Sequence, residues 1–173
     1  MLLTSEQYNI TITDSNDSLP RNPYLMAYIL DESPLKTKIS DIFKIKLGLD
    51  KYEISARSNS DKMEKAASVS NWLLAIRKSE FVVTDSFHGM VFSIIYNKPF
   101  VVIENKERGM ARFISLLNIF GLKNRLFNLN DDISKFIDDL DEINYNSVNE
   151  ILKQKRNQSL EFIISSLRDD INT

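Results

Sequence analysis

The only histidine of the chain lies in the sequence Ser86-Phe87-His88-Gly89. The residues before it form an apolar run typical of a β-strand, and the residues after it are apolar in the manner of a buried helix. The pattern therefore predicts that His88 lies in the first turn of a helix that follows a strand. In α/β proteins, such junctions hold ligands that carry negative charge. An imidazole at this point can donate a hydrogen bond to a phosphate or carboxylate, or transfer a proton near neutral pH.

The neighbours of His88 fit an anion-binding helix start. Ser86 is expected to be the N-cap, with its hydroxyl accepting a hydrogen bond from a free backbone N–H. Gly89 in the first turn would let a ligand approach the backbone closely. Structural interpretations remain open, since a lone histidine here could also cap a carbonyl or face solvent. Asp85 could serve as an alternative helix cap.

A second group of candidates follows the apolar run at 100–103. Arg108 and Arg112 are spaced i,i+4 at the start of a predicted helix, where cations oppose the helix dipole. This placement is reasonable if an anion lies between them. The alternative is that both arginines are exposed and pair with Glu104 and Glu107. Arg57 and Arg125 are weaker candidates for the same pocket.

The elements that must position these residues alternate along the chain. Continuous apolar runs predict buried strands, and apolar residues at helical spacing predict helices between them. Strands are expected at 24–30, 52–56, 81–83 and 100–103, and helices at 34–47, 68–78, 87–96, 109–120, 131–142 and 147–171. The fold class is therefore α/β, a three-layer Rossmann-like domain with a mainly parallel sheet. Residues 1–22 are interpreted as an irregular lead-in or interdomain remnant, and residues 23–173 as the domain with its C-terminal helices.

The composition excludes several classes of site. The 173 residues carry a net charge of -2, which gives no reason to expect nucleic-acid binding. Cysteine is absent and histidine occurs once, so disulfides, thiolate sites and a zinc centre are not expected, and no metal is called for. No signal peptide or membrane-spanning run is recognised, which makes the cytoplasm the expected location.

The region 80–127 resembles the polysaccharide pyruvyl transferase family. The resemblance is carried by Phe81-Val82-Val83-Thr84-Asp85-Ser86-Phe87-His88-Gly89, Phe92-Ser93-Ile94, Asn97-Lys98-Pro99-Phe100, Arg112-Phe113, Leu116-Leu117, Gly121-Leu122 and Arg125-Leu126. It implies one half of a GT-B-like fold and transfer of a pyruvyl group from phosphoenolpyruvate to sugar hydroxyls, giving a ketal. Phosphoenolpyruvate is then a donor substrate, and no cofactor is expected. The resemblance places His88 in the donor site as the catalytic candidate, with Ser86, Phe87, Gly89, Arg108 and Arg112 as substrate-binding candidates.

The chain also departs from the family pattern. Many members have an arginine at the position of Ser86, and that residue would be a bidentate anion clamp. Members are also about twice as long, so this chain resembles the C-terminal, donor-binding half. We expect it to need a missing N-terminal acceptor domain and a glycan acceptor, to be inactive or nearly so alone, and to be capable of homodimer formation. The alternatives are the nucleotide-sugar-binding half of a GT-B glycosyltransferase, with Glu104 as a weak ribose ligand, or a non-catalytic anion-binding remnant.

Overall fold

A five-stranded parallel sheet forms the centre of the computed structural model, which describes residues 2–12, 19–54 and 68–171. The strand order is β2-β1-β3-β4-β5. The strands are β1 (Tyr24–Tyr28), β2 (Asp50–Glu53), β3 (Phe81–Thr84), β4 (Phe100–Ile103) and β5 (Leu126–Phe127). Every described strand pair is parallel, which confirms the predicted sheet type.

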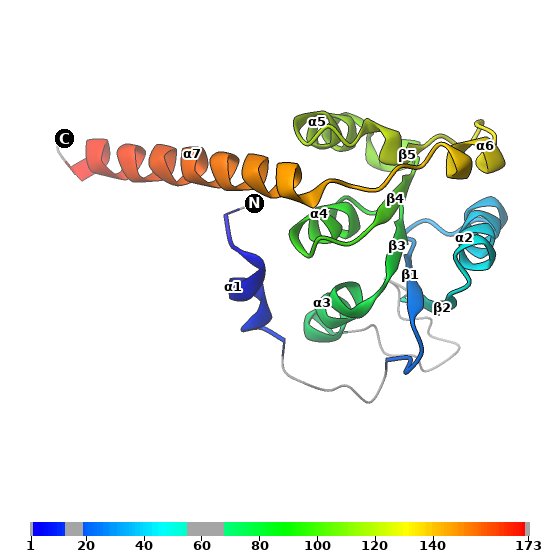
Figure 1. Cartoon of the computed structure of the whole chain (residues 1–173). Coiled ribbons are helices and arrows are strands. Elements are labelled where there is room, and N and C mark those ends of the chain that lie inside the picture. The colour runs from blue at the N-terminus through cyan, green and yellow to red at the C-terminus, as the bar shows by residue number, and fades with distance from the viewer. Residues whose placement is uncertain (1, 13–18, 55–67, 172–173) are drawn as a thin grey trace.

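Helices cover both faces of this sheet (Figure 1). On one face lie α3 (Val69–Lys78), α4 (Phe87–Ile95) and α5 (Ala111–Ile119). On the other lie α2 (Pro34–Leu47) and α6 (Ile133–Asp138). The short α1 (Ser5–Asn9) and the long α7 (Tyr145–Ile171) lie on the side of α4. The arrangement is the three-layer Rossmann-like fold that the sequence predicts.

The central strands are apolar throughout because successive side chains enter different cores. Val82 packs into the core under α3, α4 and α5, whereas Phe81 and Val83 pack into the core under α2. In β4, Val102 belongs to the first core and Val101 to the second. A strand that is buried on both faces therefore shows no polar alternation.

Helix boundaries follow the capping signals in the sequence. Ser33 caps α2 by accepting a hydrogen bond from the Lys36 N–H, and Pro34 is its first residue. Gly48 ends α2 in the left-handed conformation, with φ of 65°. Ser68 caps α3 in the same way as Ser33 caps α2. These boundaries place the strands that follow α2 and α3 next to β1 in the sheet.

Some predicted elements were wrong in extent. The second strand is β2 at Asp50–Glu53 rather than 52–56, because its backbone pairs with β1 directly after the Gly48 turn; positions 55 and 56 lie outside the described residues. The helix expected at 131–142 is only α6, capped by Asp132. The lead-in contains α1, held by a capping box at Thr4, and β5 was not predicted.

The helix α7 packs on the domain only through its first turns. Val148 and Leu152 are buried, whereas the apolar residues farther along are exposed: Leu160, Phe162, Ile163, Ile164 and Leu167. Figure 1 shows that this second half of α7 extends beyond the sheet and its covering helices. The periodicity of α7 therefore predicted a helix correctly but not what that helix packs against. No helix in the described part of the chain has the length and apolarity needed to cross a bilayer.

Candidate functional site

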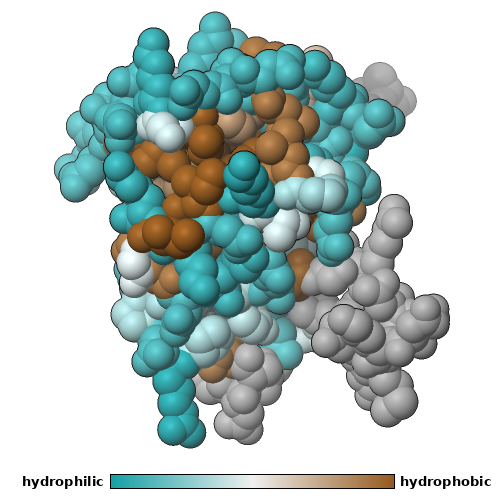
Figure 2. All heavy atoms as spheres, turned by 90° about the vertical axis from the view of Figure 1, so that its right-hand side faces the viewer, coloured by the Kyte–Doolittle hydropathy of each residue, from teal (hydrophilic) through white to brown (hydrophobic). Residues whose placement is uncertain are grey.

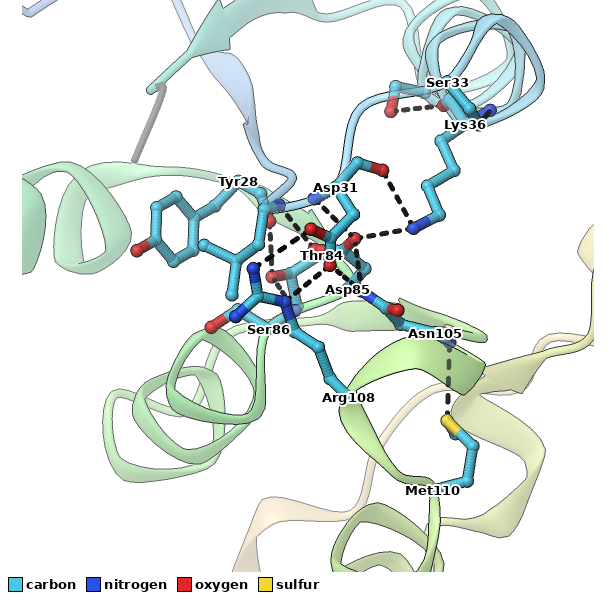
Figure 3. A network of polar contacts seen from close by, with 12 residues as sticks. Tyr28, Asp31, Ser33, Lys36, Thr84, Asp85, Ser86, Asn105, Arg108 and Met110 are labelled. Carbon is cyan, nitrogen blue, oxygen red and sulfur yellow. Dashed lines mark hydrogen bonds and ion pairs between the residues drawn. The ribbon is translucent and has the colours of Figure 1, made fainter. Parts of the chain in front are cut away.

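Polar residues gather where β1, β3 and β4 end, at the carboxyl edge of the sheet. Asp31 follows β1, Asp85 follows β3 and Asn105 follows β4. Lys36 from the first turn of α2 and Arg108 from the 3-10 helix η2 (Lys106–Arg108) complete the group. We call these five residues the carboxyl-edge cluster. Figure 3 shows their side chains converging above the ends of the strands.

Asp85 is the centre of this cluster. Its carboxylate is fully buried and accepts hydrogen bonds from the backbone N–H groups of Leu30, at 2.6 Å, and Asp31, at 3.2 Å. The Lys36 ammonium lies 2.7 Å from Asp85 Oδ2, and the Asn105 amide lies 2.9 Å from it (Figure 3). A buried carboxylate requires such partners, because burial of an unpaired charge is costly. Asp85 thus joins β1, β3, α2 and the β4 loop, and it does not cap α4.

Asp31 holds Arg108 at the outer side of the cluster. Arg108 Nε donates to Asp31 Oδ2 at 2.5 Å, and Arg108 Nη2 donates to Asp31 Oδ1 at 3.0 Å (Figure 3). Asn105 donates to the same Asp31 oxygen as Arg108 Nε, at 2.7 Å. The Arg108 hydrogen bonds, followed by that of Asn105, hold the pKa of the Asp31 carboxyl well below its usual range. Arg108 is therefore paired with Asp31, and with neither Glu104 nor Glu107.

The start of α4 leaves hydrogen-bond donors free beside an exposed imidazole. Ser86 is the predicted N-cap, and its Oγ accepts from the Gly89 N–H at 3.4 Å. In the described part of the chain, the backbone N–H groups of Phe87 and His88 have no acceptor, as expected for the first two residues of a helix. His88 is exposed, whereas Ser86 is buried. A small anion could be bound here by two amides, an imidazole and the helix dipole.

The structure gives a packing reason for Gly89. A Cβ at this position would lie 2.4 Å from Thr84 Oγ1, so α4 can approach the end of β3 only with glycine here. Thr84 Oγ1 in turn donates to the Tyr28 carbonyl at 2.6 Å and accepts from the Ser86 N–H at 3.0 Å. The side of Gly89 that faces Thr84 is thus filled by protein, and packing against Thr84 is enough to require a glycine here. Close approach of a ligand to the Gly89 backbone stays a prediction.

Arg112 lies near the start of α4, where its guanidinium group contacts aromatic rings. Its guanidinium carbon is 4.9 Å from the centre of the Phe87 ring and 5.6 Å from that of Phe113. The Phe87 ring is 6.1 Å from the imidazole of His88, edge to face. Arg112 is exposed and has no ion pair in the described residues. Its charge is therefore available to an anion near Phe87, whereas that of Arg108 is already matched by Asp31.

Of the weaker candidates, the structure places Arg125 away from this edge. Arg57 lies outside the described residues. Arg125 is buried at the start of β5, at the opposite edge of the sheet, in the 3-10 helix η3 (Lys123–Arg125). Glu104 accepts from the Leu129 N–H at 3.4 Å and pairs with Lys106 at 3.6 Å. Within the described ranges, no three or more His, Asp or Glu side chains are grouped as a metal site would require.

The sequence reasoning missed Asp31, Lys36 and Asn105 and gave Asp85 only a capping role. One signal could have found them: in a parallel sheet, residues that directly follow the apolar strands meet at one edge. Asp31, Asp85 and Asn105 each lie within three residues of a strand end. Lys36 could be recognised only from its place in the first turn of the helix after β1.

A family model described as polysaccharide pyruvyl transferase matches residues 5–107, which is more than half of the chain. The matched region includes the start of α4 and the cluster from Asp31 to Asn105, and it ends one residue before Arg108. No curated protein and no solved structure matches this chain.

Proposed function

The chain belongs to the polysaccharide pyruvyl transferase family, and we propose that it binds phosphoenolpyruvate at the start of α4 as the donor of a pyruvyl group. The observation that carries the proposal is the exposed His88 beside two free backbone amides at the carboxyl end of β3. In open α/β sheets, ligands bind at this edge. Phosphoenolpyruvate is small and carries a phosphate and a carboxylate, which suits a site built of N–H donors and cations.

The reaction we propose consumes one phosphoenolpyruvate and two hydroxyl groups of a sugar. A proton adds to the methylene carbon, which becomes the methyl group, and a sugar hydroxyl attacks the electron-poor central carbon. The bond from that carbon to the phosphate oxygen breaks, and a second hydroxyl closes the cyclic ketal with loss of its proton. The first hydroxyl also loses its proton when it attacks. The two hydroxyl protons released equal the one added to the methylene carbon and the one taken up by the departing phosphate, so the products are the pyruvyl ketal and inorganic phosphate and the protons balance. Stabilising the departing phosphate is the step that suits the helix N-terminus of α4.

His88 is the catalytic residue in this proposal. Its imidazole contacts the phosphate and can supply the proton that the leaving group takes. The amides of Phe87 and His88 bind a phosphate oxygen, and Arg112, which lies over the Phe87 ring, supplies positive charge. Many members of the family have arginine where this chain has Ser86. Ser86 is buried and caps α4, so we propose that Arg112 takes the part of that arginine.

The sugar acceptor requires a second surface, which we propose is supplied by an acceptor domain related to the other half of a GT-B-like fold. The apolar stripe on the second half of α7 supports this proposal. Four of its exposed residues, Leu160, Ile163, Ile164 and Leu167, recur at the spacing of one helix face, and such a patch marks a protein contact. A homodimer through the same stripe is the competing arrangement. Size-exclusion chromatography with light scattering separates the two, because only the homodimer forms in the isolated chain.

Donor binding can be tested by calorimetry on the purified chain. Phosphoenolpyruvate is expected to bind, and His88→Ala to weaken that binding by about 10- to 100-fold, the size of one lost charge-assisted hydrogen bond. Lys123→Ala is the matched control, since Lys123 is exposed in η3 at the opposite edge of the sheet. Equal affinity of wild type and His88→Ala would contradict the donor site.

Two further ligands distinguish the alternatives. Binding of a uridine diphosphate sugar without binding of phosphoenolpyruvate would favour the glycosyltransferase alternative. In that alternative Glu104 would be the ribose ligand, but Glu104 already contacts Leu129 and Lys106, which argues against this role. Inorganic phosphate that binds as tightly as phosphoenolpyruvate would indicate only a general anion site. Transfer itself is measured as phosphate release in the presence of acceptor glycans. We expect little or none without the acceptor domain.

A further inference from the structure

A pocket on the face away from α4 is not used by the proposed reaction. It has a volume of about 470 Å³ and lies between α2, α6 and the segment that leads into α7. Its apolar lining includes Phe43 and Leu47 of α2, Phe81 of β3, and Ile137 and Leu140. Figure 2 shows hydrophobic side chains gathered on this face. Because Phe81 begins β3, the pocket lies at the amino edge of the sheet, opposite His88.

One cation is buried in this apolar lining. Arg125 is 2% exposed and lines the pocket. One of its terminal nitrogens donates to the Asp141 carbonyl, but its Nε, also buried, has no hydrogen-bond partner among the described residues. No carboxylate in that part of the chain forms an ion pair with it. Burial lowers the pKa of the Arg125 guanidinium, and the nearby Tyr145 and Asp141 offset this lowering only in part.

A buried guanidinium without an anion is uncommon, because the cost of removing it from water is normally offset by a paired charge. The pocket that Arg125 lines is within the size range of small-molecule sites, and most of its lining surface is apolar. We propose that this pocket binds a medium-chain aliphatic carboxylate. The carboxylate lies at the Arg125 side of the pocket, where the guanidinium supplies positive charge, and the alkyl chain of the ligand lies along Phe43, Leu47 and Leu140.

The acidic residues around the pocket decide the head group. Glu80, Asp141 and Glu142 are exposed and also line it. Each of them repels an anion, and a dianion is repelled more than a monoanion. A carboxylate therefore fits this surrounding better than a phosphate monoester. The apolar lining accommodates the alkyl chain of the ligand, so the affinity for the carboxylate should rise about fourfold for each methylene group added to it, until the pocket is full.

The test is calorimetry of the intact chain with sodium decanoate. 1-Decanol has the same chain without the charge, and decyl phosphate carries a larger charge. We expect decanoate to bind at least tenfold more tightly than either. Binding of decanol equal to that of decanoate would overturn the role of Arg125, and tighter binding of decyl phosphate would overturn the choice of head group. No decanoate binding would overturn the whole proposal.

Two variants of α2 locate the binding site. Leu47→Glu places a charge in the lining of the pocket, at a half-exposed position that tolerates a polar group. Ile45→Glu is the matched control, since Ile45 lies on the same helix, is exposed and does not line the pocket. Decanoate affinity should fall at least tenfold in Leu47→Glu and stay within twofold in Ile45→Glu. Equal effects would place decanoate elsewhere on the surface.

A third variant concerns the cation directly. Arg125→Met should still bind both decanoate and decanol but should no longer prefer decanoate. A retained preference for decanoate would contradict the proposal. If Arg125→Met does not fold, because the Asp141 contact is lost, the α2 pair still decides the outcome. Phosphoenolpyruvate binding is not involved, so this proposal can fail independently of the proposed donor site.

Discussion

Replacing Lys36 by methionine should strongly destabilise the fold. Its ammonium lies 2.7 Å from Asp85, and the two side chains are 7% and 0% exposed. Methionine leaves the Asp85 carboxylate buried without its cation, and removal of one partner from a buried pair costs about 3–5 kcal/mol. At about 2–4 °C of melting temperature per kcal/mol for a chain of this size, the midpoint should fall by about 6–20 °C. The assay is thermal and urea unfolding at pH 7, followed by circular dichroism.

Lys46→Met provides the matched control. It is the same substitution in the same helix, and Lys46 pairs with Asp138 at 3.0 Å with both side chains more than half exposed. Such a pair contributes about 0–1 kcal/mol. An equal loss of stability in the two variants would therefore refute the argument that burial, rather than the ion pair as such, makes the Lys36 contact important.

A double-mutant cycle separates the ion pair from the loss of the lysine side chain. In Asp85→Asn the charge that Lys36 neutralises is gone, so Lys36 becomes an unpaired buried cation. Replacing Lys36 by methionine in that background should cost little or even stabilise, giving a coupling energy of about 3 kcal/mol. If Lys36→Met costs as much in the Asp85→Asn background as in the wild type, the stabilisation comes from packing of the lysine stem, and the electrostatic reasoning is wrong.

Two further predictions concern the same edge of the sheet. Gly89→Ala should destabilise the fold by about 1–3 kcal/mol, because the alanine Cβ would lie 2.4 Å from Thr84 Oγ1. In a Thr84→Ala background, Gly89→Ala should cost less stability. Urea unfolding of the wild type, the two single variants and the double variant measures the difference. The Asp31–Arg108 pair predicts a pH dependence. Since the folded pKa of Asp31 is lowered, the pair stabilises fully above the unfolded value of about 3.9 and is lost as the pH falls through the folded pKa. The melting-temperature difference between wild type and Arg108→Gln should therefore be constant from pH 7 to 5 and shrink below about pH 4. A difference that grows on acidification would contradict the stabilising role of the Asp31–Arg108 pair.

The elements of the domain were predictable because their signals are local. The run Phe81-Val82-Val83 is apolar at every position, and the structure explains this by burial on both faces. Gly48 and Ser86 define the end of one helix and the start of another through their own backbone and side-chain preferences. Such signals require no knowledge of what lies across the sheet.

The carboxyl-edge cluster was not predictable in the same way. Lys36 and Asp85 are 49 residues apart in the sequence, and a lysine near a helix start usually remains in solvent. Its burial becomes evident only when β1 and β3 are known to be neighbours, which is a fact of strand order rather than of local pattern. The pairing of Arg108 with Asp31 could not be predicted for the same reason. Its spacing from Arg112 suggested a shared anion, but the loop after β1 brings Asp31 to it instead.

This engagement of Arg108 can be used to find out whether it binds the donor. Asp31 occupies both Nε and one terminal nitrogen of the guanidinium, so a phosphate must displace Asp31 or share what remains. Asp31→Asn removes the competing charge and should tighten phosphoenolpyruvate binding about tenfold, or 1.4 kcal/mol, if Arg108 reaches the donor. Glu107→Gln removes the same charge from the exposed neighbour of Arg108 and should change affinity less than twofold. Equal affinities in these two variants, or weaker binding in Asp31→Asn, would show that Arg108 only fixes the loop after β1 and that His88 and Arg112 must provide the anion contacts.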